Sequence, residues 1–269
     1  GTSFSENSPG LLSIEVQEPS NTHSLSFDGV DDYVDISSLV GISLTEFTYS
    51  GWFKTSGPNG MEQPLINTQN GTLVISPDQA TLYAAAYSQR NGVSPRYRVD
   101  TDSSVPVNEW HHFAFTVGSG TYKLYVDGQL ADDSEIEEPH NSIYADAEIG
   151  SHGRSNGANS AFFNGLLDNI SIWNFQLDAN QILDIKDIEL LGTENGLIAF
   201  WDFDEGSGAT VNEFTGNGYN SSIVGAVYNS DVPFIGSTTT SDLSWSLQIQ
   251  GSHSASRELN ERDNYLGVA

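Results

Sequence analysis

Hydrophobic and polar residues alternate with a period of two along most of the chain. In the segment Thr48–Lys54, for example, Tyr49 and Phe53 alternate with Thr48 and Ser50. Alternation of this kind predicts β-strands whose two faces meet different environments. The same pattern, or a short apolar run between turn residues, predicts further strands at Ser24–Asp28, Tyr33–Ile36, Leu73–Ser76, Thr81–Tyr87, Tyr97–Thr101, Trp110–Val117, Tyr122–Val126, Ala147–Ser151, Leu167–Trp173, Leu197–Phe203 and Ser222–Tyr228.

Turn residues separate these strands at short, regular intervals. Gly118-Ser119-Gly120 predicts a hairpin, and Asp127-Gly128 predicts another turn. A helical period occurs once, at Asp178–Ile188, with an aspartate as N-cap and an apolar stripe of Ile182, Ile185 and Ile188. The pattern therefore predicts an all-β fold: a two-sheet antiparallel sandwich with one short helix.

Composition divides the chain into three parts. Residues 1–21 are rich in Ser, Asn and Pro and are expected to be an N-terminal extension, whereas residues 22–235 carry the sandwich pattern. Residues 236–269 begin as a linker and then present two strand-like segments, Leu243–Gln250 and Asp263–Val268. We interpret these as the start of a following module or tail, and expect the chain to be a fragment of a longer multidomain protein.

The charge excludes several classes of partner. The chain has 36 acidic and nine basic residues, a net charge of −27, and no cysteine. A surface this acidic repels phosphate, which argues against binding to nucleic acid or anionic membrane. The absence of cysteine excludes thiol catalysis and thiolate metal sites. No apolar run approaches the roughly 20 residues that a membrane-spanning helix needs, so membrane insertion is not expected.

Motifs typical of enzymes are mostly missing. Gly153–Gly157 matches the Gly-x-Ser-x-Gly pattern, but a polar loop surrounds Ser155, whereas a nucleophile elbow needs a preceding apolar strand and a following helix. The sequence contains no His-Glu-x-x-His helix, P-loop or dinucleotide motif. We therefore predict no catalytic residue. A scattered set of Tyr, His and Arg residues stays open as an alternative.

An acidic turn is the strongest candidate for metal binding. Asp28, Asp31 and Asp32 place three carboxylates beside Gly29 in one turn, and calcium prefers carboxylate and carbonyl oxygens. The alternative is a simple hairpin turn whose acidic side chains face water. A second acidic loop, Asp202–Glu213, resembles an EF-hand only superficially, because its first glycine falls at position five rather than six and its flanks are strands.

Positive charge is concentrated in two short segments. Tyr87–Arg98 and Ser151–Asn159 together hold four of the nine basic residues. Guanidinium groups match carboxylate and sulfate geometry, so these segments could bind an anionic polysaccharide or an acidic peptide. The alternative is that the arginines pair locally with neighbouring acids. The candidate ligand-binding residues are Tyr87, Arg90, Arg96, Arg98, His152 and Arg154.

Several motifs, in order, resemble the laminin G-like and pentraxin-like jelly-roll domains of the concanavalin A-like group. They comprise the opening strands Ser24–Val34, the Phe-Thr strand Phe47–Lys54, the Trp-His-His strand Asn108–Val117, the Leu-Tyr-Val-Asp-Gly turn Leu124–Gly128, the strand Phe163–Asn174 and the closing segment Gly192–Gly208. The resemblance implies a jelly roll. It also implies a structural calcium between the first and last strands, held by Asp28, the Gly29 carbonyl, Asp32 and Asp168.

The resemblance further implies a secreted or cell-surface bacterial multidomain protein. We expect a non-catalytic recognition or adhesion module that binds a glycan, or another surface ligand such as an extracellular protein, with calcium as a structural cofactor. One alternative is a structural spacer that contacts neighbouring modules of the same chain. Another is a polysaccharide-degrading enzyme with an unrecognised site.

Overall fold

The described strands form two large antiparallel sheets and one small one. The computed structural model describes residues 21–68, 71–76, 80–87, 96–135, 147–152 and 161–233. The first sheet contains β1 (Ser24–Asp28), β3 (Phe47–Thr55), β8 (His111–Gly118), β9 (Thr121–Val126), β10 (Gln129–Glu135), β14 (Asn164–Trp173), β15 (Leu197–Trp201) and β18 (Val227–Asn229). The second contains β2 (Tyr33–Asp35), β4 (Gln63–Asn67), β5 (Gly71–Ile75), β6 (Leu82–Tyr87), β7 (Arg96–Asp100), β11 (Glu148–Ile149), β16 (Thr210–Val211) and β17 (Ser221–Val224).

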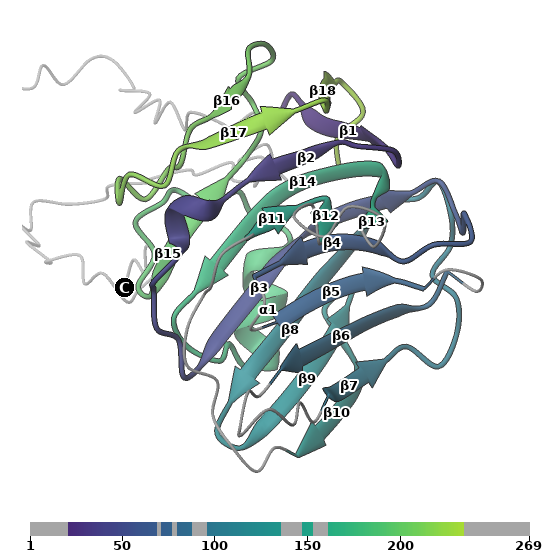
Figure 1. The fold of residues 1–269 in the computed structure, drawn as a ribbon. Helices are drawn as coiled ribbons and strands as arrows, with labels where there is room; N and C mark the ends of the chain where they lie inside the picture. The colour runs from purple at the N-terminus through teal and green to yellow at the C-terminus, as the bar shows by residue number, and fades with distance from the viewer. Residues whose placement is uncertain are drawn as a thin grey trace, which may run out of the picture. The chain divides into compact units, whose positions relative to one another are not determined.

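The strand order is that of a jelly-roll sandwich, as predicted. The first sheet runs β10-β9-β8-β3-β14-β1-β18, with β15 beside β14, and the second runs β16-β17-β2-β11-β4-β5-β6-β7. Half of the neighbouring pairs in these two sheets join strands that are not consecutive in the sequence, and the two sheets face each other (Figure 1). A separate pair, β12 (Ser151–His152) and β13 (Ala161–Phe162), lies next to β4.

The alternation in the sequence sorts side chains between the two faces of the first sheet. In β3, Tyr49 and Phe53 enter the core between the sheets, where both are fully buried. Trp52, on the opposite face, is covered from outside and retains 9% exposure. Phe47, Phe113 and other aromatic side chains fill the core. Burial of this apolar area supplies the main favourable free energy of folding.

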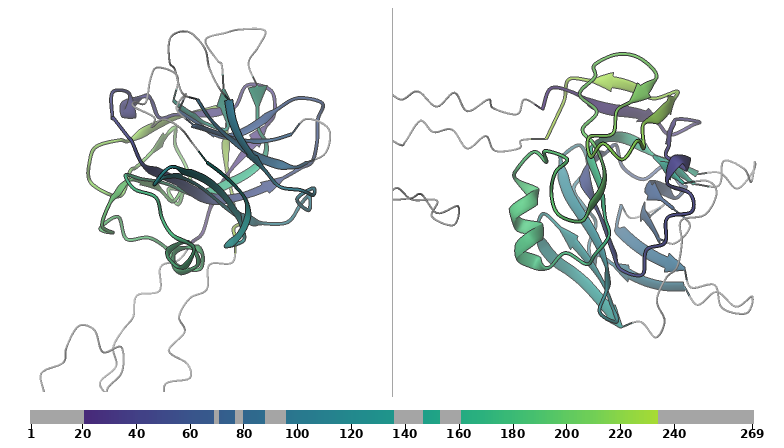
Figure 2. Two further views of the ribbon diagram at one scale, coloured as in Figure 1. Left: turned by 90° about the horizontal axis from the view of Figure 1, so that it is seen from below. Right: turned by 90° about the vertical axis from the view of Figure 1, so that its left-hand side faces the viewer.

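The one α-helix among the described residues covers the outer face of the first sheet. Helix α1 spans Ala179–Lys186, and the described residues also include a short 3-10 helix, η1 (Ser37–Leu39), between β2 and β3. Asp178 caps α1 by accepting hydrogen bonds from the backbone N–H groups of Asn180 and Gln181. Ile182 is fully buried and packs in a small cluster with Trp173. Figure 2 shows the helix outside the sandwich. Among the described residues, no helix is long and apolar enough to span a membrane.

Some element predictions were wrong in detail. Ile188 lies beyond the helix and is 46% exposed, so it does not belong to a buried stripe. The predicted strand Ser222–Tyr228 is two strands, β17 and β18, separated by a turn at Gly225 whose φ is +79°. Strands β4 and β10 were not predicted. The chain divides into two units, residues 1–237 and 238–269, and all described residues lie in the first; the expected domain boundaries stay a prediction.

Candidate functional site

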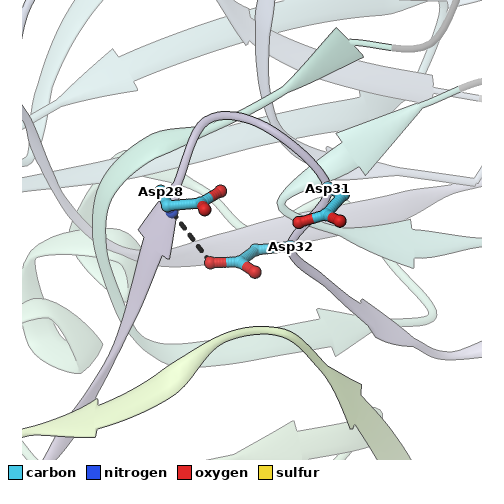
Figure 3. Close-up of side chains that lie close together, drawn as sticks. All are labelled: Asp28, Asp31 and Asp32. Carbon is cyan, nitrogen blue, oxygen red and sulfur yellow. Dashed lines mark hydrogen bonds between the residues drawn. The ribbon is translucent and has the colours of Figure 1, made fainter.

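Three carboxylates gather in the turn that joins β1 to β2. One oxygen from each of Asp28, Asp31 and Asp32 lies within 4.8 Å of the others, and we call this set the turn cluster. Asp28 and Asp31 are exposed, whereas Asp32 is only 6% exposed. Figure 3 shows the three side chains around the bend of the turn.

Backbone contacts hold the turn cluster in place. Asp32 Oδ2 accepts a hydrogen bond of 2.9 Å from the Asp28 N–H (Figure 3), and Asp28 Oδ1 accepts one of 2.8 Å from the Val30 N–H. The other Asp32 oxygen lies against Gly225, in the space that a Cβ would fill. Burial raises the pKa of Asp32, although the hydrogen bond from Asp28 lowers it; the charges of Asp28 and Asp31 raise it further. A cation among these oxygens would relieve that repulsion.

The turn cluster has the donor chemistry that calcium prefers. It offers carboxylate oxygens from a single loop, two of them on exposed side chains that an ion can reach. None of the ion pairs within the described residues involves any of the three aspartates. The residues therefore fit a hard divalent cation.

Asp168 does not join the turn cluster, contrary to the arrangement that the resemblance implied. In the β1–β14 pairing, Asp28 lies opposite Asn164, whereas Leu25 lies opposite Leu167. Asp168 is therefore next to the beginning of β1, roughly four residues or about 13 Å from the turn. Expecting one site with four protein ligands was wrong, because the antiparallel register places these carboxylates at opposite ends of the strand.

Asp168 belongs to a second acidic group. One oxygen from each of Glu189, Asp202 and Asp204 lies within 4.8 Å of the others, and we call this set the buried cluster after Asp202, which is buried, whereas Glu189 and Asp204 are half-buried. Asp168 is fully buried next to it, and the charges of Asp204 and Asp202 act on its carboxylate. Its Oδ2 accepts a hydrogen bond of 2.8 Å from Asn21 Nδ2.

The start of the described chain is attached to this region. Asp204 Oδ1 accepts hydrogen bonds from the backbone N–H groups of Thr22 and His23 at 2.7 and 2.6 Å. The Asn21 Oδ1 atom is buried without a hydrogen-bond partner among the described residues. An amide oxygen and several carboxylates thus converge, which is again the donor set of a calcium site.

The carboxylates here are strongly perturbed. Burial raises the pKa of Asp202 to about 7; the hydrogen bond from the Asp204 N–H lowers it, and the charges of Asp204, Glu205 and Glu189 raise it. Burial likewise raises the pKa of Asp168 well above its ordinary range. Both shifts mean that the hydrogen bonds to these carboxylates do not offset the cost of burying their ionised forms.

The two predicted basic segments contribute residues to one polar group on the outer face of the second sheet. The Arg98 guanidinium lies over the Tyr83 ring, 4.0 Å from its centroid. The Tyr83 hydroxyl donates a hydrogen bond of 2.5 Å to Glu62 Oε1, and His152 Nε2 lies 3.3 Å from Glu62 Oε2. We call Glu62, Tyr83, Arg98 and His152 the outer-face cluster. It connects Arg98 and His152 through two intervening side chains.

Local pairing also occurs, as the alternative interpretation expected. Arg98 Nε donates a hydrogen bond of 2.6 Å to Asp100 Oδ1. Tyr87 and Arg96 are paired across β6 and β7, but their side chains lie outside the described part of the structure. Arg90 and Arg154 lie outside the described residues altogether.

The chain matches the family model of the concanavalin A-like lectin/glucanases superfamily over residues 28–183. It belongs to that superfamily. No curated protein matches it in sequence. Among solved structures, this superfamily member is similar to a candidate carbohydrate binding protein from Bacteroides ovatus, with 18% identity and a TM-score of 0.61. That match covers 78% of this chain and 60% of the other, so the chain spans less than two thirds of its relative.

Two further structures share parts of the fold more distantly. The sialidase module CBM40 of Ruminococcus gnavus, bound to α2,3-sialyllactose, has 14% identity and a TM-score of 0.46, covering 62% of this chain and 98% of the other. A pentraxin of Limulus polyphemus has 14% identity and a TM-score of 0.44, covering 61% and 82%.

The sequence did not reveal Glu62, Tyr83, Asp202 or Asp204 as parts of these groups. Asp202 and Asp204 belong to the loop Asp202–Glu213, whose sequence resembles an EF-hand only superficially. Glu62 and Tyr83 carried no local motif. Tyr83 lies beside Arg98 through the pairing of β6 with β7, and Glu62, just before β4, reaches both Tyr83 and His152.

Proposed function

We propose that this superfamily member is a non-catalytic carbohydrate-binding module and that the outer-face cluster contacts the glycan. The observation that carries the proposal is the chain of contacts from Arg98 through Tyr83 and Glu62 to His152. It joins a guanidinium, a carboxylate and an imidazole on one sheet face. Such convergent donors and acceptors are what a site needs to orient sugar hydroxyl and carboxylate groups.

The exposure of the cluster supports binding from solvent. The side chains of Arg98, Glu62 and His152 are 41%, 38% and 29% exposed, whereas Tyr83 is buried beneath Arg98. Tyr83 therefore positions Arg98 by a cation–π contact and does not itself offer a ring to the ligand. Arg98 keeps free N–H groups beyond its bond to Asp100, and these suit an acidic sugar. The similarity to the Bacteroides ovatus protein adds support at the level of ligand class.

A glycan array tests this proposal. The unmodified chain should bind a defined subset of glycans, in calcium-containing buffer, and Arg98→Ala and His152→Ala should each reduce that signal about tenfold. Lys123→Ala is the matched control, because it removes one positive charge from the first sheet. An array without signal, or an equal loss in the control, would refute the assignment of this face.

We also propose that calcium stabilises the fold. The turn cluster supports this through its exposed carboxylates, and the buried cluster with Asp168 supports it through uncompensated buried charge. When bound, the ion would neutralise these groups and hold the turn or the start of β1. The turn cluster lies at the end of β1 and the buried cluster lies near its start. The contribution of each cluster to calcium-dependent stability can therefore be measured separately.

Thermal unfolding with calcium and with excess chelator tests the calcium proposal. A hundredfold excess over Kd stabilises the folded state by about 2.7 kcal/mol, which corresponds to a shift of roughly 5–10 °C in Tm. Asp31→Asn should remove the shift if the turn cluster binds the ion, and Asp202→Asn should remove it if the buried cluster does. An unchanged Tm after complete metal removal would overturn the proposal.

The expected setting is an extracellular or cell-surface protein. The alternative hypothesis is a structural spacer that contacts other modules. It predicts no glycan binding. Time-dependent release of oligosaccharide from a bound polysaccharide would instead reveal an enzyme, with the Tyr83, Arg98 and His152 set as its first candidate site.

A further inference from the structure

A cavity of about 340 Å³ lies away from the three groups described above. The β7–β8 connection forms one wall, and the hairpin between β9 and β10 forms the other. We propose that this cavity binds one uncharged pyranose unit. The residues on which the argument depends are Asp102, Ser104, Val105, His111, Gln129 and Leu130.

The cavity offers polar groups that are not engaged elsewhere. The side chains of Asp102, Ser104 and Gln129 line it and make no hydrogen bond to any part of the chain that the structure describes. Together they supply a carboxylate, a hydroxyl and an amide, which can both accept from and donate to sugar hydroxyls. The volume is at the lower end of the range for ligand pockets, which suits one sugar ring.

A fixed histidine forms part of the wall. His111 is only 8% exposed, and its Nδ1 lies 2.9 Å from Asp127 Oδ2. The other Asp127 oxygen accepts a hydrogen bond of 2.9 Å from the His112 N–H, so the carboxylate is held at both ends. The Nε2 atom of His111 is buried and has no hydrogen-bond partner among the described residues. The ring is therefore held in one orientation at the cavity wall.

The charge of the lining selects the ligand. The cavity is lined by Asp102 and Asp127 and by no lysine or arginine among the described residues. A uronate or sialate would therefore meet two carboxylates without a counter-charge. Val105 and the half-exposed Leu130 add apolar surface against which the C–H face of a pyranose can pack.

This cavity is distinct from the outer-face cluster, because none of the four residues of that cluster lines it. Arg98 is exposed on the outer face, whereas the neighbouring Val99 is buried in the core with 1% exposure. Only the class of ligand rests on the proposed function. The two sites are expected to differ in preference, with acidic sugars at Arg98 and neutral sugars in the cavity.

Ligand-observed NMR and titration calorimetry test the proposal on the full chain. The probes are the methyl glycosides of glucose, galactose and mannose, with glucuronate for comparison. At least one neutral glycoside should bind more tightly than glucuronate. Asp102→Ala and Gln129→Ala should each weaken that binding about tenfold. Asp133→Ala, an equal change of charge on the same hairpin but outside the cavity, should leave it within about twofold.

The outcomes separate the two proposals. Arg98→Ala should leave the binding of neutral glycosides unchanged even where it abolishes the array signal. Absence of binding by all three glycosides, a preference for glucuronate, or equal effects of Asp102→Ala and Asp133→Ala would overturn the cavity proposal. Each variant is checked by thermal unfolding, and since Asp102 and Gln129 are exposed, no loss of folding is expected.

Discussion

The Asp32 carboxylate lies against the Cα of Gly225, in the space that a side chain at this position would occupy. This contact joins the turn after β1 to the turn between β17 and β18. Gly225 has a φ of +79°, which L side chains adopt only with strain. Both the backbone conformation and the contact with Asp32 therefore favour glycine at this position.

Gly225→Ala should destabilise the fold by roughly 2–4 kcal/mol, because it adds a steric clash with Asp32 to the backbone strain. Gly216→Ala is the matched control, since its φ is +77° and nothing lies within 4 Å of the added Cβ. That control should lose only about 1–2 kcal/mol. Denaturant unfolding measures the free energy of unfolding of both variants. Equal losses of stability would show that the clash with Asp32 does not contribute to the effect of Gly225→Ala.

His112 should make the protein less stable in acid. Burial lowers its pKa to about 3, with the Lys186 charge adding to the effect, from an ordinary value of 6.5. The unfolded chain therefore binds more protons between these values, and stability is full above pH 6.5 and falls as the pH decreases. The loss at pH 4.5 should be about 2–3 kcal/mol. His112→Gln should remove this part of the pH dependence in urea unfolding.

Asp202 should have the opposite effect. Its pKa rises from 3.8 to about 7, chiefly through burial, so the folded state holds the extra proton between these values. Its contribution to stability is present at low pH and decreases as the pH rises through 7. In chelator at pH 8, Asp202→Asn should therefore be more stable than the unmodified chain by roughly 2–4 kcal/mol. A variant that is less stable under these conditions would contradict the cause assigned to the shift.

Asp178→Ala should cost about 1 kcal/mol, because it removes the cap that accepts from the N–H groups of Asn180 and Gln181. Asp184→Ala, within the same helix and exposed, should change stability by less than about 0.5 kcal/mol. Chemical unfolding followed by the fluorescence of Trp173, which packs under α1, measures both.

The sequence predicted the fold well wherever the alternation of side chains was visible. Strand β4 could not be predicted from alternation, because all five of its residues are buried. Pro64 also interrupts it, at an irregularity in the pairing with β5. Strand β10 could not be predicted because its sequence is acidic and mostly exposed, without an apolar face. It is a strand because it pairs with β9.

The candidate sites were predictable only where they are local. The three residues of the turn cluster lie within five consecutive positions of the sequence, so the sequence alone shows its carboxylates together. The surroundings of Asp168 were not, because Asn21, Asp202 and Asp204 reach it through long-range contacts. The same holds for the outer-face cluster, where Glu62 lies just before β4 and Tyr83 lies in β6.

The pairing of β1 with β18 determines how the domain would respond to tension. Ser24 lies opposite Asn229, and the strands are antiparallel, so the chain enters and leaves the domain at the same end of this pair (Figure 1). A force that pulls the two ends apart loads the hydrogen bonds of the pair one after another, as in a zipper, rather than all together in shear. Asp231 bonds to the Ser24, Lys54 and Trp110 side chains at that end. Together with the bonds of Asn21, Thr22 and His23 to Asp168 and Asp204, these are the first bonds to carry the load.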